Sequence, residues 1–278
     1  MNQLETFISQ FKNKTIGVAV YDLQTQKEIL INADEMMHPA STMKVPVMME
    51  VFRQAYKGLL SLDEQLEIFN SFKSIADGSD FALEATDDSE TTLYKRIGET
   101  ESIRELIRLM IVRSSNLASN ILLEKVGIAR VNAFIKELSI ADMAVIRGLE
   151  DKKALRLNLN NSASAHSSTS MMRMIAKGKV ISRETCDEMI QIMLGQEFNE
   201  SIPALLPTDV KVAHKTGWSG DFFHDTGIVF PRNRKPYAIS LFTHGFPEDK
   251  ETEAHACMAQ VSRIIYEEMF VETMDDRQ

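Results

Sequence analysis

Residues 38–52 read HPASTMKVPVMMEVF, and the organisation of the chain is easiest to understand from this segment. After a turn signal, apolar residues recur at helical spacing at Val47, Met48, Val51 and Phe52. The segment is therefore predicted to form a helix with one buried face.

Two polar residues at the start of this helix suggest chemistry. Ser41 and Lys44 are three residues apart, which places them on the same helical face. A serine hydroxyl becomes a good nucleophile when a base takes its proton, and a buried lysine with a lowered pKa can be that base. Two simpler interpretations are open. Ser41 can be an ordinary helix N-cap, and a second Ser-x-x-Lys pair, Ser9 and Lys12, lies in a predicted surface helix.

The composition restricts the class of protein. The chain has 278 residues, of which 44% are hydrophobic and 26% charged, enough for one large domain or two lobes. A net charge of −9 argues against nucleic acid as a partner, because no basic surplus is available to neutralise phosphates. Cys186 and Cys257 lie among apolar residues and are predicted to be buried free thiols, with a disulfide left open. The six histidines show no metal-ligand spacing, so we expect no metal and no cofactor.

Targeting signals are lacking in the sequence as it stands. Residues 1–5 have no basic region and no apolar run follows them, and no stretch of 18 apolar residues occurs. We therefore expect no membrane span and a cytoplasmic location. The alternative is an exported protein whose signal has been removed. A monomer is expected.

Strand signals fall into two groups near the ends of the chain. Residues 15–21 and 28–31 form a predicted hairpin, and residues 210–216, 226–230 and 237–243 form the second group. Helical periodicity dominates between the groups. The simplest packing is an α/β fold of the α+β type. One five-stranded antiparallel sheet is flanked by terminal helices, and an all-helical lobe is inserted between the second and third strands.

This packing predicts two lobes that form a single catalytic domain. Residues 1–40 and 205–278 form the sheet and the terminal helices, and residues 41–204 form the helical lobe. Within the helical lobe, the acidic segment 70–100 is predicted to be a long loop with short helical turns. The boundary between such lobes is a natural place for a ligand.

Two further polar motifs belong near this boundary. Residues 114–116 read Ser-Ser-Asn and fall between two predicted helices, while residues 215–217 read Lys-Thr-Gly and end the third predicted strand. Each motif has a simple structural explanation, since the first can cap a helix and the second can be an exposed strand end.

The order of the three motifs is more informative than any of them alone. Ser-x-x-Lys, then Ser-x-Asn, then Lys-Thr-Gly is the motif set of class A β-lactamases and penicillin-binding proteins. The chain resembles this superfamily of serine hydrolases over nearly its whole length, including the run RSSNLASNILL at 113–123, and most resembles the class A branch. The resemblance implies the β-lactamase/transpeptidase-like fold. It also implies an acyl-enzyme mechanism that opens the cyclic amide of β-lactams, an activity of β-lactam catabolism and antibiotic resistance.

The resemblance also implies roles for the first two motifs. Ser41 would be the acylated nucleophile, and Lys44 would be its base, directly or through water. Ser114 would pass a proton to the leaving nitrogen. Asn116 would hydrogen-bond the side-chain amide of the substrate.

The third motif is implied to bind substrate. Lys215 and Thr216 would hold a substrate carboxylate, and Lys215 would also keep the surroundings of Ser114 positive. Gly217 and Trp218 complete the substrate-binding set. The backbone N–H groups of Ser41 and Trp218 would form the oxyanion hole.

Three features depart from the class A pattern. One is the segment 70–100, which is longer than usual and is expected to overhang the cleft. Ser115 stands where the family usually has a buried aspartate, which implies a repacked loop. The family's deacylating glutamate lies in an R-x-E-x-x-L-N loop, but here one extra residue separates Arg147 from Glu150. Glu150 is the predicted base from its spacing to the second motif, and Asp151 is the alternative. A third interpretation is that Arg147, Glu150 and Asp151 form an ion-pair cluster that only holds the loop.

Three functions stay open at this point. The leading one is a class A-like hydrolase of β-lactams. The second is a peptidase or esterase of the same fold that acts on other substrates. The third is a covalent β-lactam-binding module with little turnover. All three predict a small-molecule substrate, and Glu150 distinguishes the first from the third, because a positioned base would release the acyl group.

Overall fold

The computed structural model of the protein describes residues 3–275, and side chains as far as residue 269. Five strands form one antiparallel sheet in the order β2-β1-β11-β10-β9. Their bounds are β1 Thr15–Asp22, β2 Glu28–Ile31, β9 Lys211–Ser219, β10 Phe222–Phe230 and β11 Tyr237–His244. The predicted sheet, with two strands from the beginning of the chain and three from its end, is confirmed.

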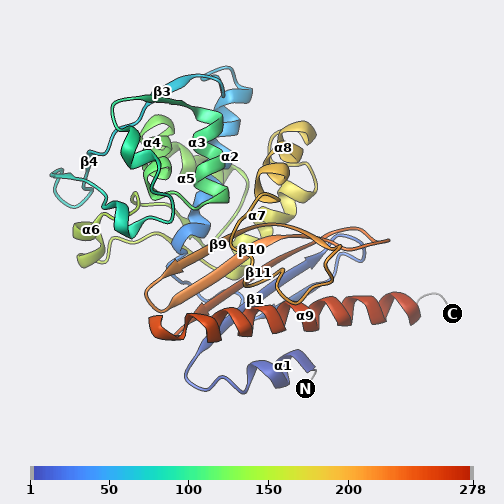
Figure 1. Ribbon diagram of the computed structural model, residues 1–278. Coiled ribbons are helices and arrows are strands. Elements are labelled where there is room, and N and C mark those ends of the chain that lie inside the picture. The colour runs from blue at the N-terminus through green and yellow to red at the C-terminus, as the bar shows by residue number, and fades with distance from the viewer. Residues whose placement is uncertain (1–2, 276–278) are drawn as a thin grey trace.

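Helices cover both faces of this sheet (Figure 1). α1 (Gln3–Ile8) and α9 (Glu251–Asp275) lie on one face, and α7 (Ala165–Ala176) packs against β1, β10 and β11 on the other. The interior strand β1 is therefore buried on both sides, with Val18 and Val20 toward the terminal helices. This position explains why its sequence is almost continuously apolar rather than alternating.

The helical lobe lies beyond α7 on the same side of the sheet (Figure 1). Its helices are α2 Lys44–Tyr56, α3 Ile103–Val112, α4 Asn116–Val126, α5 Ile128–Glu137, α6 Lys152–Arg156 and α8 Arg183–Met193. The 3₁₀ turns of the chain are η1 Ala40–Met43, η2 Ala85–Asp87, η3 Leu93–Arg96 and η4 Glu248–Lys250. The block of helices predicted between the two groups of strands is thus confirmed. The predicted surface helix around Ser9 and Lys12 is wrong, because α1 ends at Ile8 and both residues lie in the turn after it.

α2 forms the centre of the helical lobe. It packs against α3, α4, α5 and α8, and Val47, Met48 and Val51 on it are fully buried. Because neighbours surround it, its apolar residues are not confined to one narrow stripe. The residues at its amino end are therefore held by a tightly packed core.

The segment 70–100 has the irregular structure predicted for it. It holds η2, η3 and the hairpin β4 (Phe72–Lys73) and β5 (Asp80–Phe81). The short pairs β3 (Gln65–Glu67) with β6 (Thr100–Ser102), and β7 (Met143–Ala144) with β8 (Ser162–Ala163), complete the strands.

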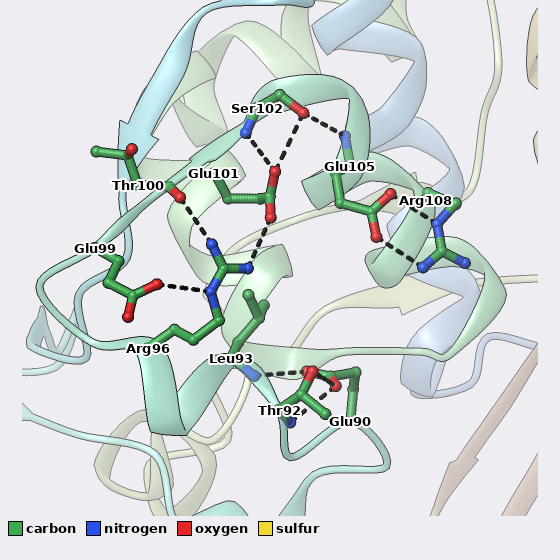
Figure 2. A network of polar contacts seen from close by, with 10 residues as sticks. All are labelled: Glu90, Thr92, Leu93, Arg96, Glu99, Thr100, Glu101, Ser102, Glu105 and Arg108. Atoms are coloured by element: carbon green, nitrogen blue, oxygen red, sulfur yellow. Dashed lines mark hydrogen bonds and ion pairs between the residues drawn. The ribbon is translucent and has the colours of Figure 1, made fainter.

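Charged side chains fix the end of this segment. Figure 2 shows the Glu90 carboxylate accepting from the backbone N–H groups of Thr92 and Leu93, at 2.8 and 3.1 Å. Beside it, Arg96 donates to the carboxylates of Glu99 and Glu101, at 2.9 and 2.8 Å. The segment is therefore a structured part of the lobe despite its low content of helix and strand.

Two details differ from the sequence-based expectations. β9 continues to Ser219 and β10 begins at Phe222, so Lys215, Thr216 and Gly217 lie inside a strand instead of at its end. The reason is that Trp218 and Ser219 pair with Phe223 and Phe222 in a tight hairpin.

The expectation for the two cysteines agrees with the structure. Cys186 and Cys257 are both free and buried. Within residues 3–275, no helix is sufficiently long and apolar to cross a membrane.

The packing of α2 gives a test of the fold. Phe52 is 3% exposed and Tyr56, one turn further on, is 65% exposed. Phe52→Ala is expected to lower the free energy of unfolding by about 3–5 kcal/mol, because it leaves a cavity in the core. Tyr56→Ala, the matched control, is expected to change it by less than about 0.5 kcal/mol. Urea denaturation measures both, and equal losses would contradict the described packing.

Candidate active site

Ser41 lies in η1, immediately before α2. It caps neither helix, since the N-cap positions are Pro39 and Met43 and neither cap is made by a side chain. The simple N-cap interpretation of Ser41 is therefore wrong. The preceding residue, Ala40, has a φ of 46°, which is unfavourable for a residue with a Cβ. Such strained backbone is typical of functional turns.

The strand β9 closes against this turn. A Cβ placed on Gly217 would lie 3.0 Å from the backbone nitrogens of Ser41 and Thr42 and from the carbonyl oxygen of Pro39. Only glycine allows so close an approach. Gly217 therefore fixes the distance between the Lys-Thr-Gly motif and Ser41.

Lys44 is fully buried at the first position of α2. Its Nζ donates to the Ser114 carbonyl at 2.5 Å, to Ser114 Oγ at 3.2 Å and to Asn116 Oδ1 at 2.8 Å. Three acceptors match the three hydrogens of an ammonium group. None of the three is Ser41, so Lys44 has to give up one hydrogen before it can accept a proton from that hydroxyl.

A second buried lysine reaches the same serine. Lys215 Nζ donates to Ser114 Oγ at 3.0 Å and to the Thr216 carbonyl at 2.8 Å. The Ser114 hydroxyl therefore lies between two amines, one from each lobe. Ser114 itself has a φ of 57°, so its backbone is held in the left-handed region.

Burial changes the acidity of both lysines. Desolvation lowers the pKa of Lys44 to about 7, although the negative charges of Asp88 and Glu150 act in the opposite direction. Desolvation also lowers the pKa of Lys215 well below its usual value, and the charge of Lys44 lowers it further. The pair can therefore hold fewer than two protons near neutral pH.

The Ser-Ser-Asn motif is organised by the start of α4. The Ser115 hydroxyl caps this helix by accepting from the N–H of Ala118 at 3.2 Å. Asn116 donates from its Nδ2 to the Asp87 carbonyl at 3.2 Å, which directs its Oδ1 toward Lys44. Ser115 is therefore a helix cap, at the position where the resemblance implies an aspartate.

The loop that contains Glu150 is closed at its base by asparagines. Asn161 Oδ1 accepts from the N–H groups of Ile146 and Arg147, at 2.7 and 3.0 Å. The guanidinium of Arg147 donates to Asn160 Oδ1 at 3.2 and 3.3 Å. In the described part of the chain, Arg147 forms no ion pair with Glu150 or Asp151, so the interpretation as an ion-pair cluster is wrong.

The two adjacent acids of this loop have different surroundings. Asp151 is 2% exposed and caps α6, and it also accepts from Ser74 Oγ at 2.8 Å and from the N–H of Ile75 at 3.0 Å. Glu150 is partly exposed and lines the same cavity as Ser41. Desolvation raises the pKa of Glu150. Asp151 also lines this cavity, but it is buried and both of its carboxylate oxygens accept hydrogen bonds, so Glu150 has the more accessible carboxylate.

α4 holds this loop in place from below. Asn120 donates to the Leu149 carbonyl at 3.0 Å and accepts from the Leu149 N–H at 2.7 Å. Gly148 permits this contact, because a Cβ there would lie 2.7 Å from Asn120 Oδ1. One helix therefore carries Asn116 at its start and, one turn later, the group that positions the Glu150 loop.

The predicted residues converge on one cavity of about 1230 Å³. The members of the predicted set that line it are Ser41, Ser114, Asn116, Glu150, Thr216, Gly217 and Trp218. Lys44 and Lys215 are fully buried and contact Ser114. The cavity also extends past Trp218 toward α9, where His255 and Ala256 line it.

Three residues near this cavity were not predicted. Asp88 accepts from the N–H groups of Asn116 and Leu117, at 2.9 and 3.0 Å. His38 Nδ1 accepts from the N–H of Ala40 at 3.1 Å, and Asn120 holds Leu149 as described. In each case a side-chain atom accepts a hydrogen bond from a backbone N–H, and no spacing pattern in the sequence predicts such a contact.

The chain is similar to known β-lactamases over most of its length. A family model described as the β-lactamase enzyme family matches residues 1–269. The chain is 25% identical over 266 residues to the extended-spectrum β-lactamase PER-1 of Pseudomonas aeruginosa, covering 92% of this chain and 83% of that protein. It is 26% identical over 289 residues to a β-lactamase of Bacteroides uniformis, covering 97% and 92%.

Solved structures agree in fold. PBP-A superimposes with a TM-score of 0.83 at 24% identity, over 96% of this chain and 94% of that one. A β-lactamase from Sphaerobacter thermophilus superimposes with a TM-score of 0.81 at 20% identity, over 94% of each chain. Together with the sheet and helices described above, they establish the fold predicted from the sequence.

The lowered pKa of Lys44 gives a test of the site. If neutral Lys44 activates Ser41, the rate at which a fluorophosphonate labels Ser41 should rise with pH, with a midpoint at about 7. The rate rises because Lys44 loses its proton above its pKa and only the neutral amine accepts one. Labelling followed by peptide mass spectrometry between about pH 5 and 9 measures this. A midpoint near the value of a free lysine, about 10.4, would contradict the assignment. Lys44→Ala should remove the titration.

Proposed function

This chain belongs to the β-lactamase enzyme family, and on that premise we propose that it is a serine hydrolase that opens the cyclic amide of β-lactams. The reaction proceeds through an acyl-enzyme at Ser41. The relatives named as β-lactamases support this activity. The observation that carries the proposal is the pair of buried lysines on the Ser114 hydroxyl, at 3.2 and 3.0 Å, beside the Ser41 turn.

Acylation requires a proton to leave Ser41 and another to reach the lactam nitrogen. Neutral Lys44 takes the proton from Ser41 as Oγ bonds to the carbonyl carbon. The carbon–nitrogen bond of the ring then breaks, and the Ser114 hydroxyl delivers its proton to the nitrogen. The Lys44 ammonium, which contacts Ser114 Oγ, replaces the proton that Ser114 has given up. The proton taken from Ser41 thus restores the Ser114 hydroxyl, and the lactam nitrogen receives the proton that Ser114 held before.

The remaining residues of the site are suited to hold the substrate. Thr216 lines the cavity and offers a hydroxyl to a carboxylate, while Lys215 supplies positive charge behind it. Asn116 keeps an amide group at the cavity wall for the substrate's side-chain amide. The backbone N–H groups of Ser41 and Trp218 are proposed to receive the oxyanion, where one donor typically contributes about 10²–10³ in rate.

Deacylation is assigned to Glu150. An acyl-serine ester persists in water unless a base activates a water molecule beside it. Glu150 is suited to this role because it lines the cavity and burial raises its pKa, which makes it a stronger base. Asp151 is unsuited to it, because both of its oxygens accept hydrogen bonds, from Ser74, Ile75 and Ala154.

One observation favours a second candidate, a covalent penicillin-binding protein with slow release. Glu150 has a φ of 60°, so its backbone is strained, and its neighbour Leu149 is the residue that Asn120 holds. Among the structural neighbours is a mutant of PBP-A described as an acyl-enzyme complex with penicillin G. In this second function Ser41 is acylated in the same way, and only the hydrolysis of the ester is slow.

The proposed activity has a direct test. The purified protein should hydrolyse a chromogenic cephalosporin with many turnovers per molecule. Ser41→Ala should lower the turnover rate by about 10⁴-fold or more, because the nucleophile is lost. Hydrolysis of a simple nitrophenyl ester in the absence of cephalosporin turnover would favour an esterase of the same fold. Turnover by Ser41→Ala at the parent rate would exclude Ser41 as the nucleophile.

The assignment of Glu150 is tested by trapping the intermediate. Glu150→Gln should leave the acylation rate within about twofold and slow deacylation by about 10²–10⁴-fold, because only the base is removed. The penicillin adduct should then accumulate on Ser41 in an intact mass spectrum. Asp151→Asn is the adjacent control and should not trap the adduct. If the parent protein itself accumulates a long-lived adduct, the slow-release function is correct.

A further inference from the structure

Asp88 is a buried acid that connects the irregular segment 70–100 to the active site. It follows η2 and is 8% exposed, and it lines the cavity that contains Ser41. Its Oδ2 accepts from the backbone N–H groups of Asn116 and Leu117, at 2.9 and 3.0 Å. A carboxylate so buried is stable only where donors replace its lost hydration.

These contacts complete the amino end of α4. The first four N–H groups of a helix have no partner within it. In α4, the N–H of the N-cap Ser115 donates to the Leu109 carbonyl at 3.0 Å, Asn116 and Leu117 donate to Asp88, and Ala118 donates to Ser115 Oγ at 3.2 Å. Asp88 therefore satisfies half of these groups. Its negative charge also lies at the positive end of the helix dipole.

The amino end of α4 fixes the positions of Ser114 and Asn116. Asn116 accepts from Lys44, and Ser114 precedes the helix by two residues and accepts from both Lys44 and Lys215. A shift of the helix end would therefore move all three acceptors of Lys44 together. A misplacement of about 1 Å in such a site can cost about 100-fold in rate.

The charge of Asp88 also acts on Lys44. Three charged side chains face Lys44: Lys215 on β9, Asp88 on the segment after η2, and Glu150 on the loop before α6. Asp88 is the stronger of the two acids in raising the pKa of Lys44 against the effect of burial. Without it, Lys44 would lose its proton at a lower pH.

Hydrogen bonds from within the segment 70–100 also hold the Asp88 carboxylate in position. Its Oδ1 accepts from the N–H of Glu90 at 3.1 Å, and its Oδ2 accepts from the Tyr94 hydroxyl at 2.9 Å. Glu90 in turn is held by the N–H groups of Thr92 and Leu93 in the network of Figure 2. The network therefore supplies a rigid support for a carboxylate that points at α4.

We propose that Asp88 is a positioning residue for the attack of Ser41. Its carboxylate holds the amino end of α4, and through it Ser114 and Asn116, in the arrangement that Lys44 requires. This inference rests on the proposed function only in taking Ser41 as the nucleophile and Lys44 as its base, and it assigns no substrate.

The test measures nucleophile activation without a β-lactam. Fluorophosphonate labelling of Ser41 forms an oxygen–phosphorus bond and releases fluoride, while Lys44 takes the serine proton. Its rate is followed against pH for the parent, Asp88→Asn, Asp88→Glu and the control Asp80→Asn. The Asp80 carboxylate lies on the same segment and pairs with Lys73 at 2.7 Å on the surface, so its neutralisation should leave the labelling rate within about twofold.

Asp88→Asn should change two quantities at once. The maximal labelling rate should fall by about 10- to 100-fold, because the end of α4 loses its anion. The midpoint of the pH profile should move to lower pH by about one unit, because a negative charge near Lys44 is lost. Asp88→Glu keeps the charge but displaces it, so its rate should fall while its midpoint stays at the parent value. A residue with only a structural role would not move the midpoint.

Several results would overturn the proposal. One is a labelling profile for Asp88→Asn that matches the parent in rate and midpoint. Another is unfolding of both Asp88 variants while Asp80→Asn remains folded, which would assign Asp88 to the stability of the fold. If the parent is labelled at Ser41 yet does not hydrolyse the chromogenic cephalosporin, the proposed function is wrong. The role of Asp88 is still decided by the pH profiles of labelling, because these need no β-lactam.

Discussion

The hydroxyl of Ser114 accepts from two fully buried lysines, one on α2 and one on β9. Two ammonium groups that contact the same hydroxyl repel each other, and burial makes the charged form of each lysine less stable. The site is stable because the pKa values of Lys44 and Lys215 are lowered and because Asp88, Glu150 and Asp225 supply opposite charge. The same conditions that make the arrangement costly give Lys44 a neutral form near its pKa of about 7, which is the form that activates a serine.

The fold brings these groups together from distant parts of the chain. The core of the helical lobe fixes the start of α2, the sheet fixes β9, and Gly217 lets the two meet at the Ser41 turn. α4 then joins the second motif to the Glu150 loop through Asn116 and Asn120. The groups proposed for acylation and for deacylation thus both contact one helix, whose amino end donates to the Asp88 carboxylate of the segment 70–100.

Much of this could be predicted from the sequence, and the remainder has a common physical cause. The strands, the helices and the Ser41, Lys44 and Lys215 set follow from local periodicity and from motifs a few residues long. Asp88 and Asn120 could not be found in this way, because each meets a backbone group 28 or 29 residues away. The sequence alone also does not distinguish Glu150 from Asp151 as the proposed deacylating base. The choice between them depends on the capping of α6 by Asp151 and on contacts to Ser74 and Ile75, which only the folded chain brings close.

Ser41 is proposed to carry the acyl group and later to lose it. This role is tested most directly by following the intact mass of the parent protein after mixing with benzylpenicillin, with peptide mapping at the earliest time. One added penicillin per chain is expected on the peptide that contains Ser41, and this adduct should then disappear as the ring-opened product accumulates. Product formation with the adduct on another residue, or acylation that leaves the Ser41 peptide unmodified, would contradict this role.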